Sequence, residues 1–271
     1  MYSYAVALEK GGCGKTALAV NLAAAFGHIG LSVLLIDLDS QASASHWLGV
    51  PAEQISAEAS MLGLLSDAMK DKANAASVTS RAVRTADGIA VLPAHELMAG
   101  LPAQLAAAPM SGLFLLKELF IQLDASAAYD VVVLDLPPAR GPVLAMALAA
   151  ATRCIVPVQP EDLVMRAVRS LLASIQQVKA RAVNADLQTS IVRNKYAPRS
   201  IADRTLDTLL REEYAALLLT TIFPVRSAMR DSALMQQSVF RYAAPDAVDV
   251  RHLFIAMVDE LITLDGGRHG S

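Results

Sequence analysis

The stretch Glu9-Lys10-Gly11-Gly12-Cys13-Gly14-Lys15-Thr16 carries the clearest signal in this chain of 271 residues. An apolar run at 2–8 precedes it and is typical of a buried strand, while the alanine-rich run at 16–26 is typical of a helix. Glycines between a strand and a helix let backbone N–H groups close around phosphate oxygens, and the helix N-terminus adds its positive end. The sequence therefore predicts a phosphate-binding loop and a bound nucleotide.

The two lysines of this phosphate loop (residues 9–16) have different expected roles. Lys15 is expected to reach the β- and γ-phosphates, and the Thr16 hydroxyl is expected to hold Mg²⁺. A second ammonium, on Lys10, is costly beside the same triphosphate unless further phosphate charge offsets it; otherwise it faces solvent at the loop mouth. The residues predicted to bind the nucleotide here are Gly11, Gly12, Cys13, Gly14, Lys15, Thr16 and Ala17.

Composition and charge limit the class of protein. The chain is 54% hydrophobic with a mean hydropathy of +0.41, yet it has no apolar run of about 18 residues. Because the first strand also lacks a basic leader, we expect a cytoplasmic protein without a stable membrane anchor. The net charge of −3 excludes a globally basic DNA-coating protein but permits a local basic patch. Cys13 and Cys154 form no CxxC pair, so no metal–sulfur site is expected.

Apolar runs alternate with amphipathic segments along the chain. Several runs, such as 131–134, are continuously apolar, which indicates strands buried on both faces of a parallel sheet. We expect a doubly wound α/β fold of the P-loop NTPase kind, its mostly parallel sheet flanked by helices, with one domain over 1–265 and a flexible tail over 266–271. The predicted strands are 4–8, 33–37, 89–93, 130–135, 155–158, 187–193 and 220–223. Further helices are predicted at 60–70, 112–125, 163–181, 201–216 and 247–264, with surface connections at 71–77 and 101–110.

Acidic residues end two of the predicted strands. Asp37 and Asp39 leave the second strand on the same side, at the edge where the phosphate loop lies. One of them is suited to the Mg²⁺ shell and the other to orienting a water, with loop capping as the alternative. Asp135 ends a continuously apolar strand, a pattern typical of a residue that reaches Mg²⁺ through water. Pro137-Pro138 stiffen the loop that follows.

These motifs resemble those of the ParA/MinD family, which has a deviant Walker A box. The resemblance covers nearly the whole chain and weakens between 50 and 86. The motifs that carry it are Lys-Gly-Gly-x-Gly-Lys-Thr at 10–16, Asp-x-Asp-x-Gln at 37–41 and Asp-x-Pro-Pro at 135–138. It implies that Lys10 reaches the nucleotide of a partner protomer, that Asp39 positions the attacking water, and that Asp37 supports it near the metal. Lys10, Lys15 and Asp39 are then the catalytic residues.

The resemblance also implies residues for the base. Family members use a residue after a late strand and a later proline-containing loop, where this chain has Asn194 and Pro224. Asn194 is equally suited to discriminating adenine through its amide and to forming a turn. Two positions depart from the family. Ser40 stands where proline is usual, and Ala17 replaces a frequent hydroxyl residue, so a contact to the α-phosphate is expected to be missing.

Basic residues in the last third match the region where relatives carry DNA-contacting arginines. They follow two predicted strands and comprise Arg193, Lys195, Arg199 and Arg204 after one, and Arg226 and Arg230 after the other. Arg199 and Arg230 are the expected DNA contacts, and Arg226 is expected either there or nearer the nucleotide or dimer face. Acidic residues intervene, so a solvated mixed-charge surface is the alternative.

Three branches of the family fit less well. The C-terminus shows no basic amphipathic helix of the MinD type, paired cysteines of iron–sulfur carriers are missing, and no segment has room for an N-terminal helix-turn-helix. What remains resembles a small ParA-type ATPase. That implies slow Mg²⁺-dependent ATP hydrolysis, a homodimer on ATP binding, nonspecific binding to double-stranded DNA, and nucleoid association. It also implies a ParB-like or other cargo adaptor that stimulates hydrolysis.

Two other functions stay open. One is a ParA/MinD-like regulator that positions or assembles its cargo on a protein or membrane surface without DNA. The other is a metabolic ligase of the dethiobiotin synthetase kind, which shares the loop and the fold. The ligase needs a substrate pocket and no lysine acting across a dimer, so Lys10 and Asp39 count against it.

Overall fold

The sheet is built from the continuously apolar runs of the sequence. The computed structural model describes residues 1–161 and 163–266, and within them eight strands form one sheet in the order β3-β4-β2-β5-β1-β6-β7-β8. Every neighbouring pair of these strands is parallel except β3 with β4. The strands are β1 (Tyr2–Val6), β2 (Val33–Asp37), β3 (Val83–Arg84), β4 (Ala90–Leu92), β5 (Val131–Asp135), β6 (Arg153–Val158), β7 (Gln188–Tyr196) and β8 (Leu218–Pro224).

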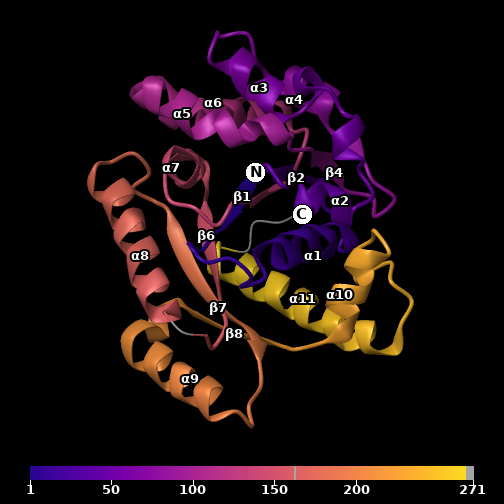
Figure 1. Cartoon of the computed structure of the whole chain (residues 1–271), viewed down its shortest axis with the longest axis vertical. Coiled ribbons are helices and arrows are strands. Elements are labelled where there is room, and N and C mark those ends of the chain that lie inside the picture. Colours follow the sequence, from indigo (N-terminus) through magenta and orange to yellow (C-terminus); the bar gives the residue numbers. More distant parts are fainter. Residues whose placement is uncertain (162, 267–271) are drawn as a thin grey trace.

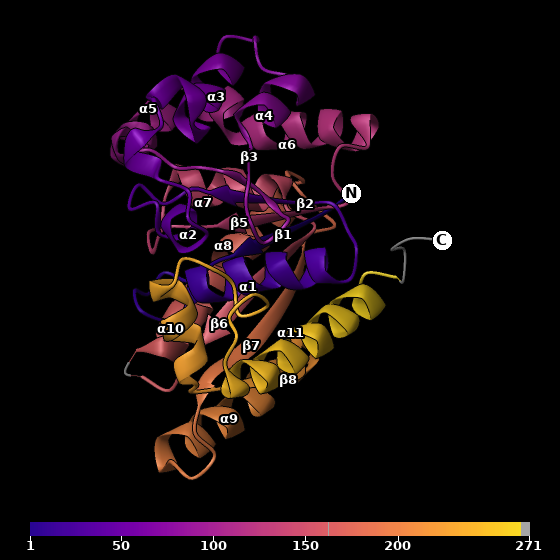
Figure 2. The same cartoon turned by 90° about the vertical axis from the view of Figure 1, so that its right-hand side faces the viewer.

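Helices cover both faces of the sheet (Figure 1). One face carries α1 (Lys15–His28), α2 (Ser43–Trp47), α10 (Ser227–Leu234) and α11 (Pro245–Leu264), and α1 lies beside α11 (Figure 2). The other face carries α3 (Met61–Ala68), α4 (Ala75–Arg81), α5 (Leu101–Ala107), α6 (Pro109–Ser126), α7 (Pro142–Ala150), α8 (Val164–Ala180) and α9 (Ile201–Tyr214). Short 3₁₀ helices occupy Ala52–Gln54, Ala57–Ala59, Glu96–Gly100 and Ala215–Leu217.

None of the helices described is by itself long and apolar enough to cross a membrane. Taken together, the segments Glu96–Ala107 and Gly112–Ser126 are long and apolar enough, but a bend of 105° separates them. That match concerns length and composition alone.

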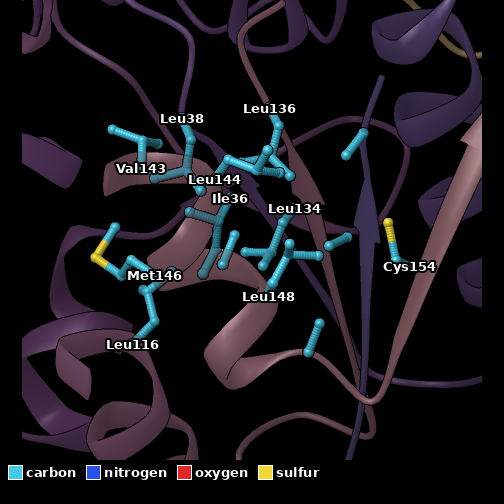
Figure 3. Packing of buried hydrophobic residues seen from close by; sticks show 14 of the residues in the cluster. Ile36, Leu38, Leu116, Leu134, Leu136, Val143, Leu144, Met146, Leu148 and Cys154 are labelled. Carbon is cyan, nitrogen blue, oxygen red and sulfur yellow. The ribbon is translucent and has the colours of Figure 1, made fainter. Parts of the chain in front are cut away.

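Alternate residues of each central strand point to opposite faces and so feed two cores. On one face, Ile36 of β2 and Leu134 of β5 pack with Leu144 of α7 (Figure 3). On the other face, Leu35 and Val133 belong to the cluster that includes the buried side of α1. Burial of each such side chain contributes about 1.5–3 kcal/mol relative to its exposure to water. A continuously apolar strand is therefore required at the centre of the sheet.

The structure confirms the predicted fold class, and every predicted strand is present, 33–37 with the same ends and the others with shifted ends. The predicted surface connection at 101–110 is wrong, because these residues form α5 and the start of α6. Pro102 lies in the first turn of α5, where proline begins a helix rather than breaking one. The predicted connection at 71–77 overlaps the start of α4. The structure also contains four elements that the sequence does not predict: β3, α2, α7 and α10. Residues 267–271 of the predicted tail lie outside the described residues.

The register of the central strands positions the site. Val6 of β1 and Asp37 of β2 both pair with Asp135 of β5, so the C-terminal ends of three adjacent strands lie level. The loops that follow these strands are therefore neighbours at one edge of the sheet. In open α/β sheets this edge is where ligands bind.

At the opposite edge, a buried polar cluster fastens the last helix to the sheet. The Asp265 carboxylate, which follows α11, accepts hydrogen bonds from Arg153 Nη2 at 2.6 Å and from the Tyr4 hydroxyl at 2.8 Å. Arg153 also donates to Ser190 Oγ at 2.9 Å, and both charged side chains are at most 5% exposed. Because the charges are paired and hydrogen-bonded, their burial is tolerated. The predicted end of the domain, at residue 265, coincides with this cluster and stays a prediction.

Asp265→Ala should lower the free energy of unfolding by about 3–5 kcal/mol, because it leaves the Arg153 guanidinium buried without a counter-charge. Urea unfolding followed by circular dichroism measures this loss. Asp259→Ala, at an exposed position of the same helix, is the matched control and should change stability by less than about 0.5 kcal/mol. Equal unfolding midpoints for both variants would show that the cluster does not hold the helix.

Candidate nucleotide-binding site

The phosphate loop joins β1 to α1 and is shaped by glycines in the left-handed region. Gly12 has φ +77° and Gly14 has φ +87°, conformations that cost little only for glycine. A Cβ on Gly14 would also lie 2.3 Å from the Asn194 Nδ2 atom. Gly14 immediately precedes α1, whose first turn has no side-chain cap. The free N–H groups of that turn are therefore available to an anion.

The Lys15 side chain is folded back into its own loop. Its Nζ donates to the Lys10 carbonyl oxygen at 2.9 Å, and the residue is only 8% exposed. The Cys13 thiol donates to the same carbonyl at 3.3 Å and is fully buried. Burial raises the pKa of Cys13, although the Lys15 charge opposes the shift, so the thiol stays neutral at pH 7.

Asp37 and Asp135 are both fully buried at the ends of neighbouring strands, but only Asp37 is held by several hydrogen bonds. The Asp37 carboxylate accepts hydrogen bonds from the Ser45 N–H at 2.9 Å, the Ser45 hydroxyl at 2.8 Å and the Asp39 N–H at 3.2 Å. Burial raises the pKa of Asp37 to about 6, while the Ser45 hydrogen bonds oppose the rise. Asp37 is therefore already occupied in holding the start of α2.

Neither carboxylate oxygen of Asp135 has a hydrogen-bond partner. Burial raises the pKa of Asp135 well above its usual value, the Asp37 charge raises it further, and nearby Thr16 and Lys15 oppose the shift. A buried carboxylate without partners is costly unless a ligand completes it. A cation shared with Thr16 would supply that completion.

The donor set suits Mg²⁺ bound together with a nucleotide. Among the described residues, no three His, Cys, Asp or Glu side chains converge on a point that could hold a metal ion. A closed protein cage is thus not formed there. Mg²⁺ is commonly held by one or two protein oxygens with phosphate oxygens and waters completing its shell. Asp135 and Thr16 fit that pattern, and Asp37 fits a supporting role better than direct coordination.

Asp39 lies at the open side of the same edge. Its carboxylate accepts the Gln41 N–H at 3.0 Å, and its carbonyl accepts the Ala42 N–H at 2.8 Å, which closes a turn. Ala42 has φ +51° just before α2. The side chain is half-buried, so it can still contact solvent or ligand. Its predicted part in positioning water remains a prediction.

A pocket of about 560 Å³ opens beside the loop, and we call it the nucleoside pocket. The structure brings the predicted residues Gly14, Ala17, Asn194 and Pro224 together in its wall. Asn194 has a further task, because its Nδ2 donates to the Cys13 carbonyl at 2.9 Å. Its Oδ1 accepts the following N–H at 3.0 Å. Asn194 therefore braces the phosphate loop, and its amide is not held free for a base.

Sequence reasoning missed several residues of this pocket. Trp47 of α2 lines it and donates its Nε1–H to the Gln237 carbonyl at 3.0 Å. Lys195 also lines it, and its Nζ donates to the Gly12 carbonyl at 2.8 Å. The sequence places Lys195 only in a basic cluster. Its position directly after Asn194, a predicted nucleotide-binding residue, indicates that it lies beside the same pocket. Trp47 gave no such signal, because α2 is too short to show a periodicity.

The predicted arginine cluster is divided by the structure. Arg193 is only 4% exposed and forms an ion pair with Asp207 at 2.8 Å, so its inclusion in a surface patch is wrong. Arg199 is exposed in the loop after β7. Arg226 and Arg230 are exposed but line the nucleoside pocket, which favours the alternative that placed Arg226 near the nucleotide.

Lys10 points to a different place from Lys15. Its Nζ forms an ion pair at 2.8 Å with Glu161, on the loop after β6. Lys10 lines a second pocket, of about 310 Å³, together with Glu9, Arg140 and Arg166. Its side chain is thus directed away from the nucleoside pocket of its own chain, and the alternative of a freely solvated lysine is not supported.

A glycine loop between a central strand and a helix, a buried lysine in that loop and an unpartnered aspartate on the adjacent strand define a P-loop nucleotide-binding protein. A family model described as "AAA domain" matches residues 1–189. The chromosome-partitioning ATPase Soj of Thermus thermophilus is 32% identical over 252 residues, which cover 92% of each chain. The chain therefore belongs to the ParA-type family of partition and positioning ATPases.

A second relative agrees with this placement, and a solved structure of another enzyme has a similar fold. The chromosome partitioning protein ParA of Caulobacter vibrioides is 26% identical over 240 residues, covering 88% of this chain and 86% of that one. A crystal structure of cobyrinic acid a,c-diamide synthase from Mycobacterium smegmatis, with bound ATP analog and magnesium, has a TM-score of 0.77. It is 28% identical and covers 99% of this chain and 97% of its own.

Asp135→Asn should stabilise the nucleotide-free protein by about 1–3 kcal/mol at pH 8, because it removes a buried negative charge beside Asp37 at nearly constant side-chain size. The folded-state pKa of Asp135 is raised, so wild-type stability falls as pH rises above the unfolded value and is regained in acid. The gain from Asp135→Asn should therefore shrink on acidification. Urea unfolding at pH 8 and pH 5 checks this, with exposed Asp186→Asn as control. A pH-independent difference would contradict it.

Proposed function

We propose that this chain is a slow, Mg²⁺-dependent ATPase that dimerises when it binds ATP, binds DNA nonspecifically as the dimer, and moves a cargo. A partner protein, ParB-like or another cargo adaptor, would stimulate hydrolysis. Membership of the ParA-type family supports the ATPase and the partition role. The DNA, the dimer and the adaptor are proposed from the arrangement of the residues and from the relatives.

Different residues at the sheet edge would contact different parts of the nucleotide and its Mg²⁺. The nucleoside pocket takes the base and ribose, and the loop N–H groups with the first turn of α1 take the phosphates. Lys15 would leave the Lys10 carbonyl for the β- and γ-phosphate oxygens. Thr16 and Asp135 would hold Mg²⁺, which offsets the charge that develops on the phosphates. Asp39 would orient the attacking water.

The direction of the Lys10 side chain is the observation that carries the proposed dimer. Lys10 and Lys15 lie on one loop, yet Lys15 is buried inside it while Lys10 lines a separate pocket. A lysine so placed lies outside its own nucleotide site and, on exchanging its Glu161 partner, would reach a phosphate there. A second copy of this chain, facing the first across the loop, would supply that phosphate and would receive the same contact in return.

Lys10→Ala should abolish the ATP-dependent dimer while ATP binding by the monomer stays close to wild type. The loss follows because each site would lack the charge contributed by its partner, and turnover should fall at least about tenfold. Light scattering with ATP and Mg²⁺ measures the dimer, and phosphate release measures turnover. Lys70→Ala, at an exposed position two residues after α3, is the control for loss of one positive charge. Normal dimerisation and hydrolysis by Lys10→Ala would refute the trans lysine.

DNA binding should need ATP and should be strongly salt-sensitive. The chain carries net negative charge, so a monomer with a few arginines binds DNA weakly, and dimerisation doubles the phosphate contacts. Electrophoretic shifts at about 50 and about 200 mM salt, with ATP or ADP, measure this. Arg199→Ala and Arg230→Ala should weaken the shift, whereas Arg226→Ala should also weaken ATP binding. Exposed Arg181→Ala is the control. If DNA is bound in this way, the protein is nucleoid-associated in the cell.

The same DNA experiment separates the alternatives. A protein that dimerises with ATP but shows no DNA shift would instead be a positioning regulator on a protein or membrane surface. The similarity to cobyrinic acid a,c-diamide synthase is the reason to retain a ligase as the second alternative. A ligase would need neither Lys10 nor a dimer for turnover, so intact ATPase activity in Lys10→Ala would favour it.

A further inference from the structure

Lys10 has a partner within its own chain. Its Nζ lies 2.8 Å from the Glu161 Oε2, and the two side chains are 21% and 47% exposed. Glu161 lies on the loop that follows β6, three residues beyond the end of the strand. The buried Gln159 donates its amide N–H to the other Glu161 oxygen, so the carboxylate is oriented toward the phosphate loop rather than free in solvent.

The backbone under Lys10 is fixed independently of this ion pair. The Lys10 carbonyl accepts Lys15 Nζ at 2.9 Å. The preceding Glu9 carboxylate is bound by Arg140, from the loop after β5, and by the Ser170 hydroxyl of α8 at 2.9 Å. Loss of the Glu161 contact would therefore remove one contact that holds the Lys10 side chain, without displacing the loop.

We propose that Glu161 is a positioning residue that retains Lys10 in its own protomer and sets the threshold for ATP-dependent dimerisation. This inference rests on the proposed trans contact of Lys10. One ammonium cannot pair with Glu161 and with a triphosphate across the dimer interface at once, so the two contacts compete. Formation of the dimer must break the intramolecular pair in both protomers.

Charge and exposure set the size of this effect. Both partners are partly solvated, and ion pairs of this kind shift an equilibrium by no more than about fivefold. The triphosphate carries several negative charges and therefore outcompetes a single carboxylate. Glu161 then tunes the concentration at which dimers form, and it does not block them.

ATP also weakens the restraint on the same loop. Transfer of Lys15 to the phosphates removes its hydrogen bond to the Lys10 carbonyl, while Glu9 still holds the preceding residue. The local change is small and lies directly beside the Glu161 pair. Nucleotide binding and release of Lys10 would therefore occur at adjacent residues of one loop.

The test compares Glu161→Gln with wild type over a protein concentration series at saturating ATP and Mg²⁺. The dimerisation midpoint should fall about two- to twenty-fivefold, because a competing charge worth up to about fivefold is removed from each of the two protomers. Glu161→Ala, a second variant lacking the carboxylate, should shift it in the same direction. Glu213→Gln is the matched control, since this carboxylate pairs with Arg169 on the surface between α8 and α9. It should leave the midpoint unchanged.

A merely structural role for Glu161 predicts the opposite result, because loss of a structural contact would weaken dimers or leave them unaltered. An unchanged or raised midpoint in both Glu161 variants, with Lys10→Ala unable to dimerise, overturns the inference and leaves the proposed function intact. Normal dimerisation of Lys10→Ala overturns both. The double variant Lys10→Ala with Glu161→Gln should behave as Lys10→Ala alone, since Glu161 acts only through Lys10.

Discussion

Two buried carboxylates held side by side form the constraint on which this structure depends. Asp37 and Asp135 end adjacent strands of the sheet, and the apolar packing on both faces fixes where those ends lie. Like charges in such a place repel each other and lose their hydration. Asp37 is compensated by Ser45 and by the turn at Asp39, whereas only the nearby Thr16 hydroxyl and Lys15 charge offset the burial of Asp135. The fold thus carries an electrostatic cost that a bound cation would remove.

The phosphate loop is stabilised by contacts that a nucleotide would have to exchange. Lys15 bonds to the Lys10 carbonyl, Lys195 to the Gly12 carbonyl and Asn194 to the Cys13 carbonyl. Each of these donors satisfies an acceptor that faces the loop interior or its rim. Because the loop is already closed in this way, a phosphate would replace one set of hydrogen bonds with another, and the backbone would need little rearrangement.

The sequence predicted those features that depend on strong local patterns. The run 131–134 is apolar at every position, so its burial in a parallel sheet followed directly, and the spacing of the glycines with Lys15 and Thr16 located the loop. The helix α7 was missed because nearly all its residues are apolar, which leaves no polar face to reveal a period. Arg193 was misplaced because a strand-end arginine looks exposed until its distant partner Asp207 is known.

Contacts between distant segments account for the rest. The Asn194 amide reaches across 181 residues of sequence to the phosphate loop, and no local pattern distinguishes this from a turn or a base contact. The ion pair between Lys10 and Glu161 also joins distant segments, and it replaces the alternative of a solvent-facing Lys10 with a partner at 2.8 Å. The kind of chemistry at the site could be predicted from the spacing of the motif residues. The partners of individual side chains, such as Asn194 and Lys10, could be known only from the fold.

The position of Trp47 has a practical consequence. This is the single tryptophan of the chain, and it lies on α2, between the turn that contains Asp39 and the segment that follows α10. Its indole forms part of the wall of the nucleoside pocket. The molecule therefore contains its own optical probe, whose emission can follow the arrival of a nucleotide and the rearrangement of the neighbouring turn without any attached dye.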